Sequence, residues 1–277
     1  MILYDMHLHS DFSSDSSTPA ASQVDSARQA GLHGICLTDH MDYDFPKEEI
    51  DFPLSPGEIP FEFSLADYFP QLKKIREENP DLTILTGIEC GLQTTPSVLE
   101  KNSVLTDMDE FDFIIGSLHL VNKKDPYYPS FWDNRDPEEA IRQYLDQLYK
   151  NITAFHHFDT LGHLDYIVRY APVSFSYEPS AFQEQIDAIL SFLIRHDIAL
   201  EFNTSGYKKT PHGNPHEDIL RRYKDLGGVA ITIGSDAHSP EYVGYRFRQA
   251  ESLLVSCGFK EYYTFQKHTP VSHQLGQ

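Results

Sequence analysis

The first residues of the chain place two histidines where a strand would aim both at one metal ion. The opening stretch MILYDMHLHSDFSSDSS brings His7 and His9 to the end of an apolar run, and Asp11 and Asp15 follow. Because residues i and i+2 of a β-strand point to the same face, the two imidazoles would face one point in space. A polar strand end followed by a serine-rich loop gives the same pattern, so the pair alone is a weak signal.

Residues of the same kind end most of the other predicted strands. The segments 37–40 (LTDH), 86–90 (TGIEC), 116–119 (GSLH), 162–165 (GHLD) and 234–238 (GSDAH) supply His40, Glu89, His119, His163, Asp236 and His238. Each residue alone has an ordinary explanation, such as a turn, a surface carboxylate or a hydrogen-bonded imidazole. Unrelated residues would not all gather at the same end of successive strands, which is where parallel barrels build their sites. The set therefore indicates one shared site.

Imidazoles mixed with carboxylates suit a site for more than one divalent ion. Neutral histidine nitrogens bind Zn, Fe or Mn, and a carboxylate can bridge two cations and reduce their repulsion. Glu89 is the natural bridge in this chain. Cys36 and Cys90 alternate with the neighbouring ligand positions, and no thiolate set is complete, so we expect both cysteines to fill the core.

The elements that must position these residues follow a repeating β/α pattern. Short β-branched apolar runs alternate with longer amphipathic segments, as expected of a parallel sheet or barrel. Strands are expected at residues 2–6, 34–38, 83–88, 113–117, 160–164, 199–202 and 229–233. Helices are expected at residues 19–30, 65–78, 96–106, 137–150, 180–196, 216–226 and 240–257. Several helices would begin with a polar cap followed by proline, as in RDPEEA.

No linker or change of composition divides the chain, so we expect residues 1–277 to form a single domain. Two long excursions interrupt the pattern. Residues 42–63 are rich in proline, and residues 122–136, which follow His119, are rich in aromatic side chains. If the fold is a barrel, loops after strands lie near the active site, whereas surface loops packed on the rim would look the same in sequence.

The bulk composition excludes several classes of partner. Acidic residues outnumber basic ones by 42 to 22, and the formal net charge of −20 would repel nucleic acid and anionic membranes. A small anionic substrate would need metal ions or a local basic cluster. Cys36, Cys90 and Cys257 are widely spaced and odd in number, which argues against disulfides. No apolar run approaches the roughly 20 residues needed to cross a bilayer, and we expect a cytoplasmic protein.

The motifs HLHS, TDH, GIE, GSLH, GHLD and GSDAH, in this order, resemble those of the PHP (polymerase and histidinol phosphatase) superfamily over nearly the whole chain. Within it, the length, Asp15 and the stretch GHLDYIVRY are similar to the bacterial histidinol-phosphate phosphatases of histidine biosynthesis. The resemblance implies an α/β fold, a distorted (β/α)7 TIM-like barrel, with three divalent metal ions. It assigns His7, His9, Glu89 and Asp236 to one ion, Glu89, His119 and His163 to a second, and Asp15, His40 and His238 to a third. Some relatives carry histidine in place of Asp15, a change that can alter the preference of the third ion.

The same resemblance implies hydrolysis of a phosphate monoester, namely L-histidinol phosphate to L-histidinol and phosphate. We expect a metal-bridging hydroxide to attack phosphorus, with Arg169 and either Lys208 or Lys209 holding the phosphoryl oxygens. The sequence does not choose between the two lysines. Asp236, His238 or a metal-bound water would protonate the leaving alkoxide.

Three alternative functions remain at this point. A PHP phosphoesterase for nucleotides or phosphotyrosine is the nearest, because metal ligands do not choose the alcohol. An amidohydrolase that cleaves C–N bonds often uses a modified lysine on the fourth strand, whereas this chain has GSLH there and Glu89 on the third. A non-catalytic metal-binding domain would have lost ligands, and this chain keeps the full set.

Overall fold

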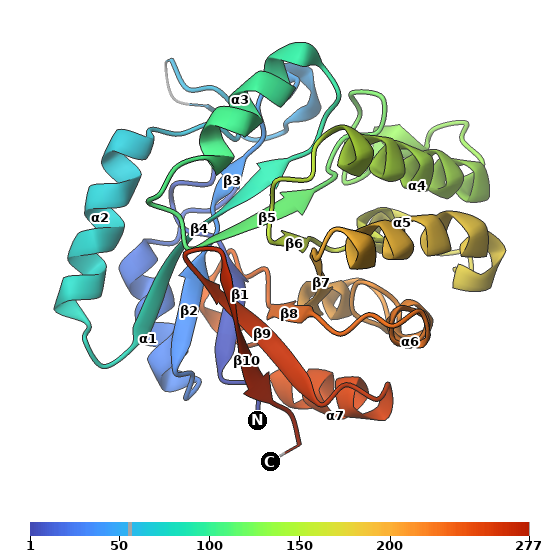
Figure 1. The fold of residues 1–277 in the computed structure, drawn as a ribbon. Helices are drawn as coiled ribbons and strands as arrows, with labels where there is room; N and C mark the ends of the chain where they lie inside the picture. Colours follow the sequence, from blue (N-terminus) through green and yellow to red (C-terminus); the bar gives the residue numbers. More distant parts are fainter. Residues whose placement is uncertain (55–56, 277) are drawn as a thin grey trace.

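Seven parallel strands form a nearly closed barrel, which a computed structural model of the chain describes for residues 1–54 and 57–276 (Figure 1). The strands follow the chain around the barrel: β1 (Tyr4–Leu8), β2 (Gly34–Leu37), β4 (Thr83–Gly91), β5 (Phe113–Ser117), β6 (Thr160–Leu161), β7 (Ala199–Asn203) and β8 (Ile231–Gly234). A parallel bridge between Leu8 and Ala237 brings the last strand next to the first. The predicted (β/α)7 barrel is confirmed. Residues 55–56, inside the 42–63 excursion, and residue 277 lie outside the described part.

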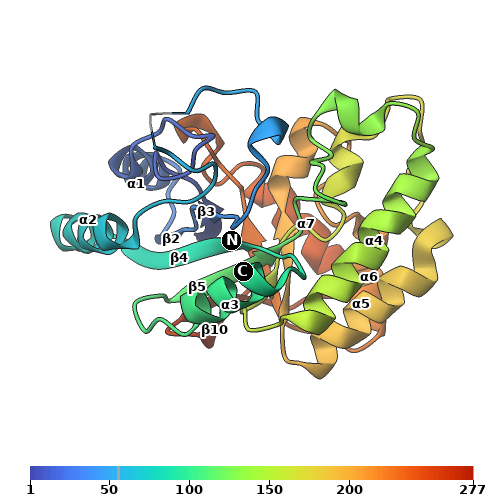
Figure 2. The same ribbon diagram turned by 90° about the horizontal axis from the view of Figure 1, so that it is seen from above.

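The helices pack on the outside of the strands, as the amphipathic pattern predicts. They are α1 (Ala20–Gln29), α2 (Leu65–Glu78), α3 (Pro96–Thr106), α4 (Pro137–Ala154), α5 (Gln183–Arg195), α6 (Glu217–Asp225) and α7 (Phe247–Ser256). Figure 2 shows α1 and α2 on one side of the strands and α4, α5 and α6 on the other. The predicted cap of α4 is present, because the side chain of Asp136 accepts a hydrogen bond from the backbone N–H of Glu139 and Pro137 is the first helical residue.

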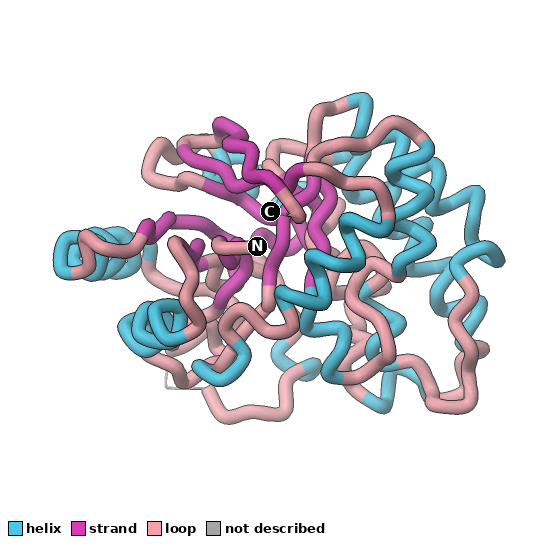
Figure 3. The backbone as a smooth tube through the Cα atoms, turned by 90° about the horizontal axis from the view of Figure 1, so that it is seen from below, coloured by secondary structure: helices cyan, strands magenta, loops and turns pink. Residues whose placement is uncertain are grey.

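The strands at the centre are buried on both faces, as expected where helices cover a parallel sheet. Every residue of β2 (GICL) and β5 (FIIGS) is buried. Seen from below in Figure 3, the strands lie in the middle with helices around them. Cys36, Cys90 and Cys257 are free, and the predicted burial of Cys36 and Cys90 is confirmed; Cys257 is buried as well. Among the described residues, no helix is long and apolar enough to cross a membrane.

Several predicted boundaries were wrong. The first strand begins at Tyr4, two residues later than expected, and a short strand β3 (His40–Met41) pairs with β4. The expected helix 240–257 is divided into a 3₁₀ turn, η6 (Pro240–Tyr242), and α7. Gly244 and Arg246 adopt positive φ angles of 67° and 55°, which an α-helix cannot contain.

A C-terminal hairpin was missed altogether. Strands β9 (Glu261–Gln266) and β10 (Thr269–Gln274) form a two-stranded antiparallel sheet that lies across the lower ends of the barrel strands in Figure 1. Further 3₁₀ turns lie in the loops: η1 (Lys47–Glu49), η2 (Pro129–Trp132), η3 (Tyr166–Tyr170), η4 (Pro179–Phe182) and η5 (Thr204–Lys208).

Closure of the barrel places the first and last histidine motifs side by side. The N–H of His9 donates to the carbonyl of Ala237 (3.0 Å), and the N–H of Asp236 donates to the carbonyl of His7 (2.8 Å). The side chain of Gln23, in α1, donates to the carbonyls of His9 (2.6 Å) and Ala237 (2.9 Å). Two segments more than 200 residues apart therefore share one rigid junction.

Candidate metal centre

A pocket of about 350 Å³ opens at the carboxyl ends of the barrel strands. Its lining contains most of the residues that the sequence singles out: Asp15, His40, His119, His163, Arg169, Lys208, Lys209, Asp236 and His238. His7, His9 and Glu89 lie beneath them and are completely buried. The strand-end pattern thus corresponds to one place in the fold.

Glu89 lies at the centre of the site, with its two carboxylate oxygens facing different histidines. Oε1 is 2.9 Å from Nε2 of His163 and 3.3 Å from Nε2 of His119. Oε2 faces three more ring nitrogens: Nε2 of His7 (3.2 Å), Nε2 of His9 (3.5 Å) and Nδ1 of His40 (3.0 Å). This is the arrangement that a carboxylate shared between two cations requires.

Several of these buried atoms have no hydrogen-bond partner among the residues that the structure describes. Nε2 of His7, Nε2 of His9, Nδ1 of His40 and Oε2 of Glu89 are all unsatisfied. A buried polar atom without a partner costs free energy, and native proteins contain few of them. Four such atoms pointing at one another are explained by a shared cation, and imidazole and carboxylate are the ligands that Zn, Fe and Mn accept. The residues present therefore fit divalent metal ions.

The ligand atoms fall into overlapping groups of three, in which all atoms lie within 4.8 Å of one another. His7, His9 and Glu89 form one group, and Glu89, His119 and His163 form another. Three further groups are His9 with His40 and His238, His7 with His163 and Asp236, and His40 with Asp42 and His119. The set that the resemblance assigns to the second ion, Glu89, His119 and His163, therefore forms one complete group. Of the set assigned to the first ion, His7, His9 and Glu89 form a group, and Asp236 is not part of it.

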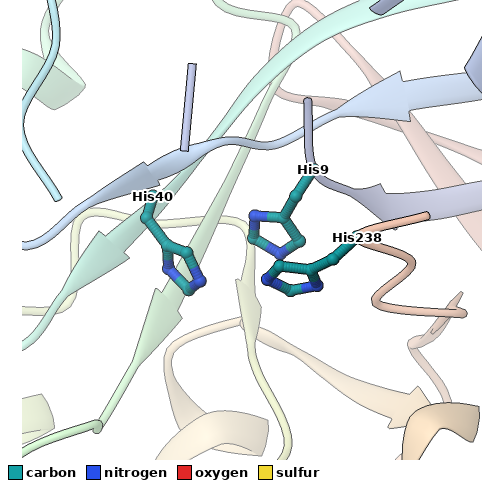
Figure 4. A group of neighbouring side chains, drawn as sticks. All are labelled: His9, His40 and His238. Carbon is teal, nitrogen blue, oxygen red and sulfur yellow. The ribbon is translucent and has the colours of Figure 1, made fainter. Parts of the chain in front are cut away.

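Asp236 and Asp15 lie at the borders of these groups. Oδ1 of Asp236 is 3.3 Å from Nε2 of His9. Oδ2 of Asp15 is 3.1 Å from Nε2 of His238 and 3.7 Å from Nε2 of His40. Figure 4 shows the rings of His9, His40 and His238 close together, and the ring of His9 stacks on that of His238 at 4.0 Å and on that of His40 at 4.3 Å. Asp15, His40 and His238 are thus neighbours, and His9 joins them.

Asp236 is held in an unusual backbone conformation. Its φ angle of 53° lies in the left-handed region, which non-glycine residues seldom adopt and which recurs at functional sites. Oδ2 accepts hydrogen bonds from Arg169 (3.0 Å), Ser205 (3.0 Å) and Asn203 (3.3 Å). These contacts leave Oδ1 directed at the histidines.

Two carboxylates that the sequence interpretation missed orient the histidines. Oε1 of Glu201, in β7, is 2.6 Å from Nδ1 of His7, and Oδ1 of Asp42 is 2.9 Å from Nδ1 of His119. Such contacts fix a histidine tautomer and turn its other nitrogen, here Nε2, toward a metal. Glu201 is one acidic residue inside the apolar, fully buried strand ALEFN, and that was the available signal.

Ser13 and Asp39 support His9 in a similar way. Oγ of Ser13 lies 3.1 Å from Nδ1 of His9 and donates a hydrogen bond to Asp39 (2.8 Å). Asp39 also accepts hydrogen bonds from the backbone N–H and the hydroxyl of Ser10. Asp11, for which the sequence leaves open a role as a loop residue or as a partner of a metal ligand, is exposed on the surface.

The charges in the site keep its carboxylates ionised. Burial raises the pKa of Glu89, but the nearby rings of His7, His40 and His119 outweigh this effect and hold the pKa well below its usual value. Burial likewise opposes ionisation of Asp236, and His7, His9 and Arg169 lower its pKa well below the ordinary range. Both groups are therefore in the form that binds cations at neutral pH.

Basic side chains flank the metal ligands. Arg169 is buried, donates to Asn214 and Asp236, and has a second terminal nitrogen, Nη2, without a partner. Lys208 is half-buried, with Nζ 3.9 Å from the centre of the Tyr242 ring, whereas Lys209 is exposed at the rim of the pocket. All three contribute to the lining of the pocket.

The two long excursions also contribute to the lining of the pocket. Phe45, Asp51 and Phe52 come from residues 42–63, and Asp125, Tyr127 and Tyr128 come from residues 122–136. Burial raises the pKa of Asp125 to about 6. Trp132 does not line the pocket; its indole N–H donates to the carbonyl of Pro126 (3.0 Å), so it supports the loop from outside.

Comparison with known proteins agrees with this geometry. The sequence model of the PHP domain family matches residues 5–205. A probable histidinol-phosphatase of Clostridium acetobutylicum is 30% identical over 264 residues, which cover 94% of this chain and 95% of the relative. A histidinol-phosphatase of Lactococcus lactis is 31% identical over 264 residues, which cover 94% of this chain and 93% of the relative.

A solved structure is similar in the same way. The crystal structure of histidinol phosphate phosphatase from Lactococcus lactis, complexed with zinc, L-histidinol and phosphate, superimposes with a TM-score of 0.86. It is 30% identical in sequence, and the match covers 97% of this chain and 98% of that one. The match therefore extends over nearly the full length of both chains.

Proposed function

The chain belongs to the PHP domain family, and we propose that it is a metal-dependent phosphatase that hydrolyses L-histidinol phosphate to L-histidinol and phosphate in histidine biosynthesis. The observation that carries the proposal is the convergence of five histidines on the two oxygens of Glu89, with Arg169 and Lys208 in the same pocket. The relatives named histidinol-phosphatase support the choice of substrate.

We propose that the site holds three divalent ions, of Zn, Fe or Mn. Zinc is supported by its presence in the Lactococcus lactis structure. When bound, the ions would neutralise charge on the phosphoryl oxygens and lower the pKa of the water that attacks phosphorus. The residues that would hold them are His7, His9, Asp15, His40, Glu89, His119, His163, Asp236 and His238, with Glu89 between ions. Asp42, close to His40 and His119, is an additional candidate.

The chain's own residues bind and orient the substrate. Arg169 is fixed by Asn214 and Asp236 and keeps Nη2 free, so it can donate to a phosphoryl oxygen without rearrangement. One of the two adjacent lysines that line the pocket, Lys208 or Lys209, would supply further positive charge to the phosphoryl group. His238 lines the same pocket and is the candidate for delivering a proton to the leaving alkoxide, whereas Asp236, which is ionised, would bind a metal ion instead.

The part of the pocket lined by the two excursions suits the organic part of histidinol phosphate. The organic part carries a cationic amine and an imidazole, and this lining presents two carboxylates, Asp51 and Asp125, among aromatic rings. Carboxylates pair with ammonium groups, and aromatic faces attract cations. A substrate with phosphate at one end and positive charge at the other therefore matches the pocket at both ends.

The remaining parts of the proposal concern the protein as a whole. We propose that residues 1–277 act as a single domain in the cytoplasm on this small-molecule phosphate monoester. The net charge of −20 supports the absence of a nucleic-acid or anionic membrane partner.

A substrate panel tests the proposal. Purified, metal-loaded protein is assayed with L-histidinol phosphate, p-nitrophenyl phosphate, nucleotides, phosphotyrosine and a set of amides. We expect kcat/KM for L-histidinol phosphate to exceed that for every other substrate by about 100-fold, because only it pairs with both ends of the pocket. Equal turnover of all phosphate esters would favour a broader PHP phosphoesterase, and amide hydrolysis without phosphatase activity would refute the proposal.

A further inference from the structure

We infer that Tyr242 is a positioning residue that holds the ammonium group of Lys208 toward the phosphate-binding end of the pocket, and that Lys208 rather than Lys209 contacts the phosphoryl group. The inference rests on the proposed function, because it specifies which lysine serves that phosphate-binding end. The chain sequence alone leaves the two adjacent lysines equivalent.

Two short 3₁₀ turns bring Tyr242 and Lys208 together. Lys208 ends η5, which follows β7, and Tyr242 ends η6, which follows the neighbouring strand β8. The start of η5 is fixed because the side chain of Asn203 accepts a hydrogen bond from the N–H of Ser205. The N–H of Tyr242 donates to the carbonyl of Ser239 (3.1 Å). Both backbones are therefore set by the barrel rim.

The side chains meet in a cation–π contact. Nζ of Lys208 lies 3.9 Å from the centre of the Tyr242 ring and 6.0 Å from that of Tyr245. Within the part of the chain that the structure describes, this ammonium forms no ion pair within 4.0 Å and donates no hydrogen bond. A π face attracts the cation but leaves its N–H groups unused, so they are available to an anion.

The surroundings of Lys208 place it with the rest of the phosphate-binding end. Burial lowers its pKa, while the charges of Asp236 and Arg169 act on it in opposite directions. Lys208, Tyr242, Arg169 and Asp236 all line the same pocket. The ammonium thus lies in the field of both the predicted metal ligand and the predicted arginine clamp.

Lys209 lacks these features. It is exposed, and among the described residues its ammonium has neither an ion pair nor an aromatic ring beneath it. A free lysine loses more side-chain entropy on binding an anion than one that is already held in place. Tyr242 therefore distinguishes two residues that are chemically identical.

A second layer holds the ring of Tyr242. Tyr245 packs against it edge to face, with the ring centres 5.4 Å apart. Arg246 in turn lies over Tyr245 (5.4 Å) and Tyr207 (5.2 Å), and its Nε donates to the hydroxyl of Tyr245. Arg246, Tyr245, Tyr242 and Lys208 thus form a continuous row of contacts that begins at the surface. The contacts with Tyr245 and Lys208 limit the rotamers that Tyr242 can adopt.

The test measures binding of inorganic phosphate to metal-loaded protein by isothermal titration calorimetry. The variants are Lys208→Met, Tyr242→Leu, Tyr242→Phe and the double variant Lys208→Met/Tyr242→Leu, with Lys209→Met as the matched control. We expect Lys208→Met to weaken phosphate binding about tenfold and Tyr242→Leu about fivefold, because each removes a charge-assisted or cation–π contribution. Tyr242→Phe keeps the ring and should stay within about twofold of wild type, as should Lys209→Met. The double variant should bind no more weakly than Lys208→Met.

Three results would overturn the inference. The first is that Tyr242→Leu weakens phosphate binding by the same factor with and without Lys208. The second is that Tyr242→Phe loses as much phosphate affinity as Tyr242→Leu. The third is that Lys209→Met, and not Lys208→Met, loses phosphate affinity. Bound metal and Tm are measured for each variant, and Tyr242→Met replaces the leucine variant if that one does not fold. Phosphate binding requires no turnover, so a protein that behaves as expected here but shows no preference for L-histidinol phosphate would refute the proposed function alone.

Discussion

Two histidine-rich hollows lie at opposite ends of the barrel. At the carboxyl ends of the strands, His7, His9, His40, His119 and His163 surround Glu89. At the amino ends, a hollow of about 700 Å³ is lined by His156, His157, His196 and His268, next to the β9–β10 hairpin. The second hollow is twice as large as the first, at about 350 Å³. Neither histidine number nor hollow size identifies the site.

The difference lies in what faces the imidazoles. His156 packs against His196 (4.6 Å between ring centres) and His157 (5.5 Å), and His196 stacks on Phe192. Among the described residues, no carboxylate oxygen lies within 4.0 Å of these three rings. Burial, followed by the charges of His196 and His157, lowers the pKa of His156. A cation between His156, His157 and His196 would find nitrogen ligands without an adjacent carboxylate to offset its charge.

Metal removal should give the largest effect and should act on the carboxyl end only. We expect chelation to abolish phosphatase activity, and a divalent ion to restore it, because the buried ligand atoms have no other partner. Elemental analysis should give about three metal equivalents per chain. The double variant His156→Gln/His196→Gln should contain the same amount, and a lower metal content in it would contradict the comparison.

Replacement of Glu89, the central carboxylate, should have the second-largest effect on activity. Glu89→Gln should lower kcat by about 100-fold or more, because a neutral amide compensates the repulsion between two cations poorly. Asp159→Asn is the matched change at the amino end, where Asp159 pairs with His268 at 3.0 Å, and it should leave kcat within about twofold. If Glu89→Gln kept activity within a few-fold of wild type, Glu89 would not lie between ions.

The sequence predicts one end of the barrel better than the other for a physical reason. The strands of the carboxyl-end site are continuous apolar runs that end in polar residues, a pattern with local periodicity. Strand β10, TPVSHQ, is polar and mostly exposed, so the hairpin at the amino end has no such signal. The break before α7 depends on the positive φ of Arg246, and arginine gives no sequence signal for a positive φ.

Within the site, ligand types were predictable and partners were not. His7 and Glu201 are separated by 194 residues, and only the closed barrel brings them to 2.6 Å. The choice between Lys208 and Lys209 depends on Tyr242, which belongs to a different β/α unit. Long-range contacts of this kind follow from the fold and have no local pattern.

Loss of an orienting carboxylate should have an intermediate effect. Glu201→Gln keeps the size of the side chain but weakens its contact with Nδ1 of His7, so we expect about a 10- to 100-fold loss of metal affinity. Competition with a chromogenic chelator measures this affinity. Asp159→Asn, which removes the charge beside His268, is again the control and should not alter it. Unchanged affinity in Glu201→Gln would mean that the barrel alone orients His7.

Within the pocket at the carboxyl ends, replacement of Asp125 should affect one substrate more than another. Asp125→Asn removes a carboxylate from the aromatic lining of the pocket, and we expect kcat/KM for L-histidinol phosphate to fall about tenfold. Activity on p-nitrophenyl phosphate, which carries no cation, should remain within about twofold. Equal losses on both substrates would show that Asp125 supports the loop and does not select the substrate.

The smallest effect should come from the ion pair at the amino end, and it concerns stability rather than activity. The hydrogen bond with Asp159 raises the pKa of His268 above its ordinary value of 6.5. A raised folded-state pKa stabilises the protein fully below the unfolded value, and this contribution disappears as pH rises through the folded value. Because the pair is partly exposed, we expect only about 0.5 kcal/mol. His268→Gln should therefore lower Tm by about 1–2 °C at pH 5.5 and leave it unchanged at pH 9, with catalysis unaffected at both. A Tm difference that grew with pH would refute this sign, and a change in kcat would show that the two ends of the barrel are coupled.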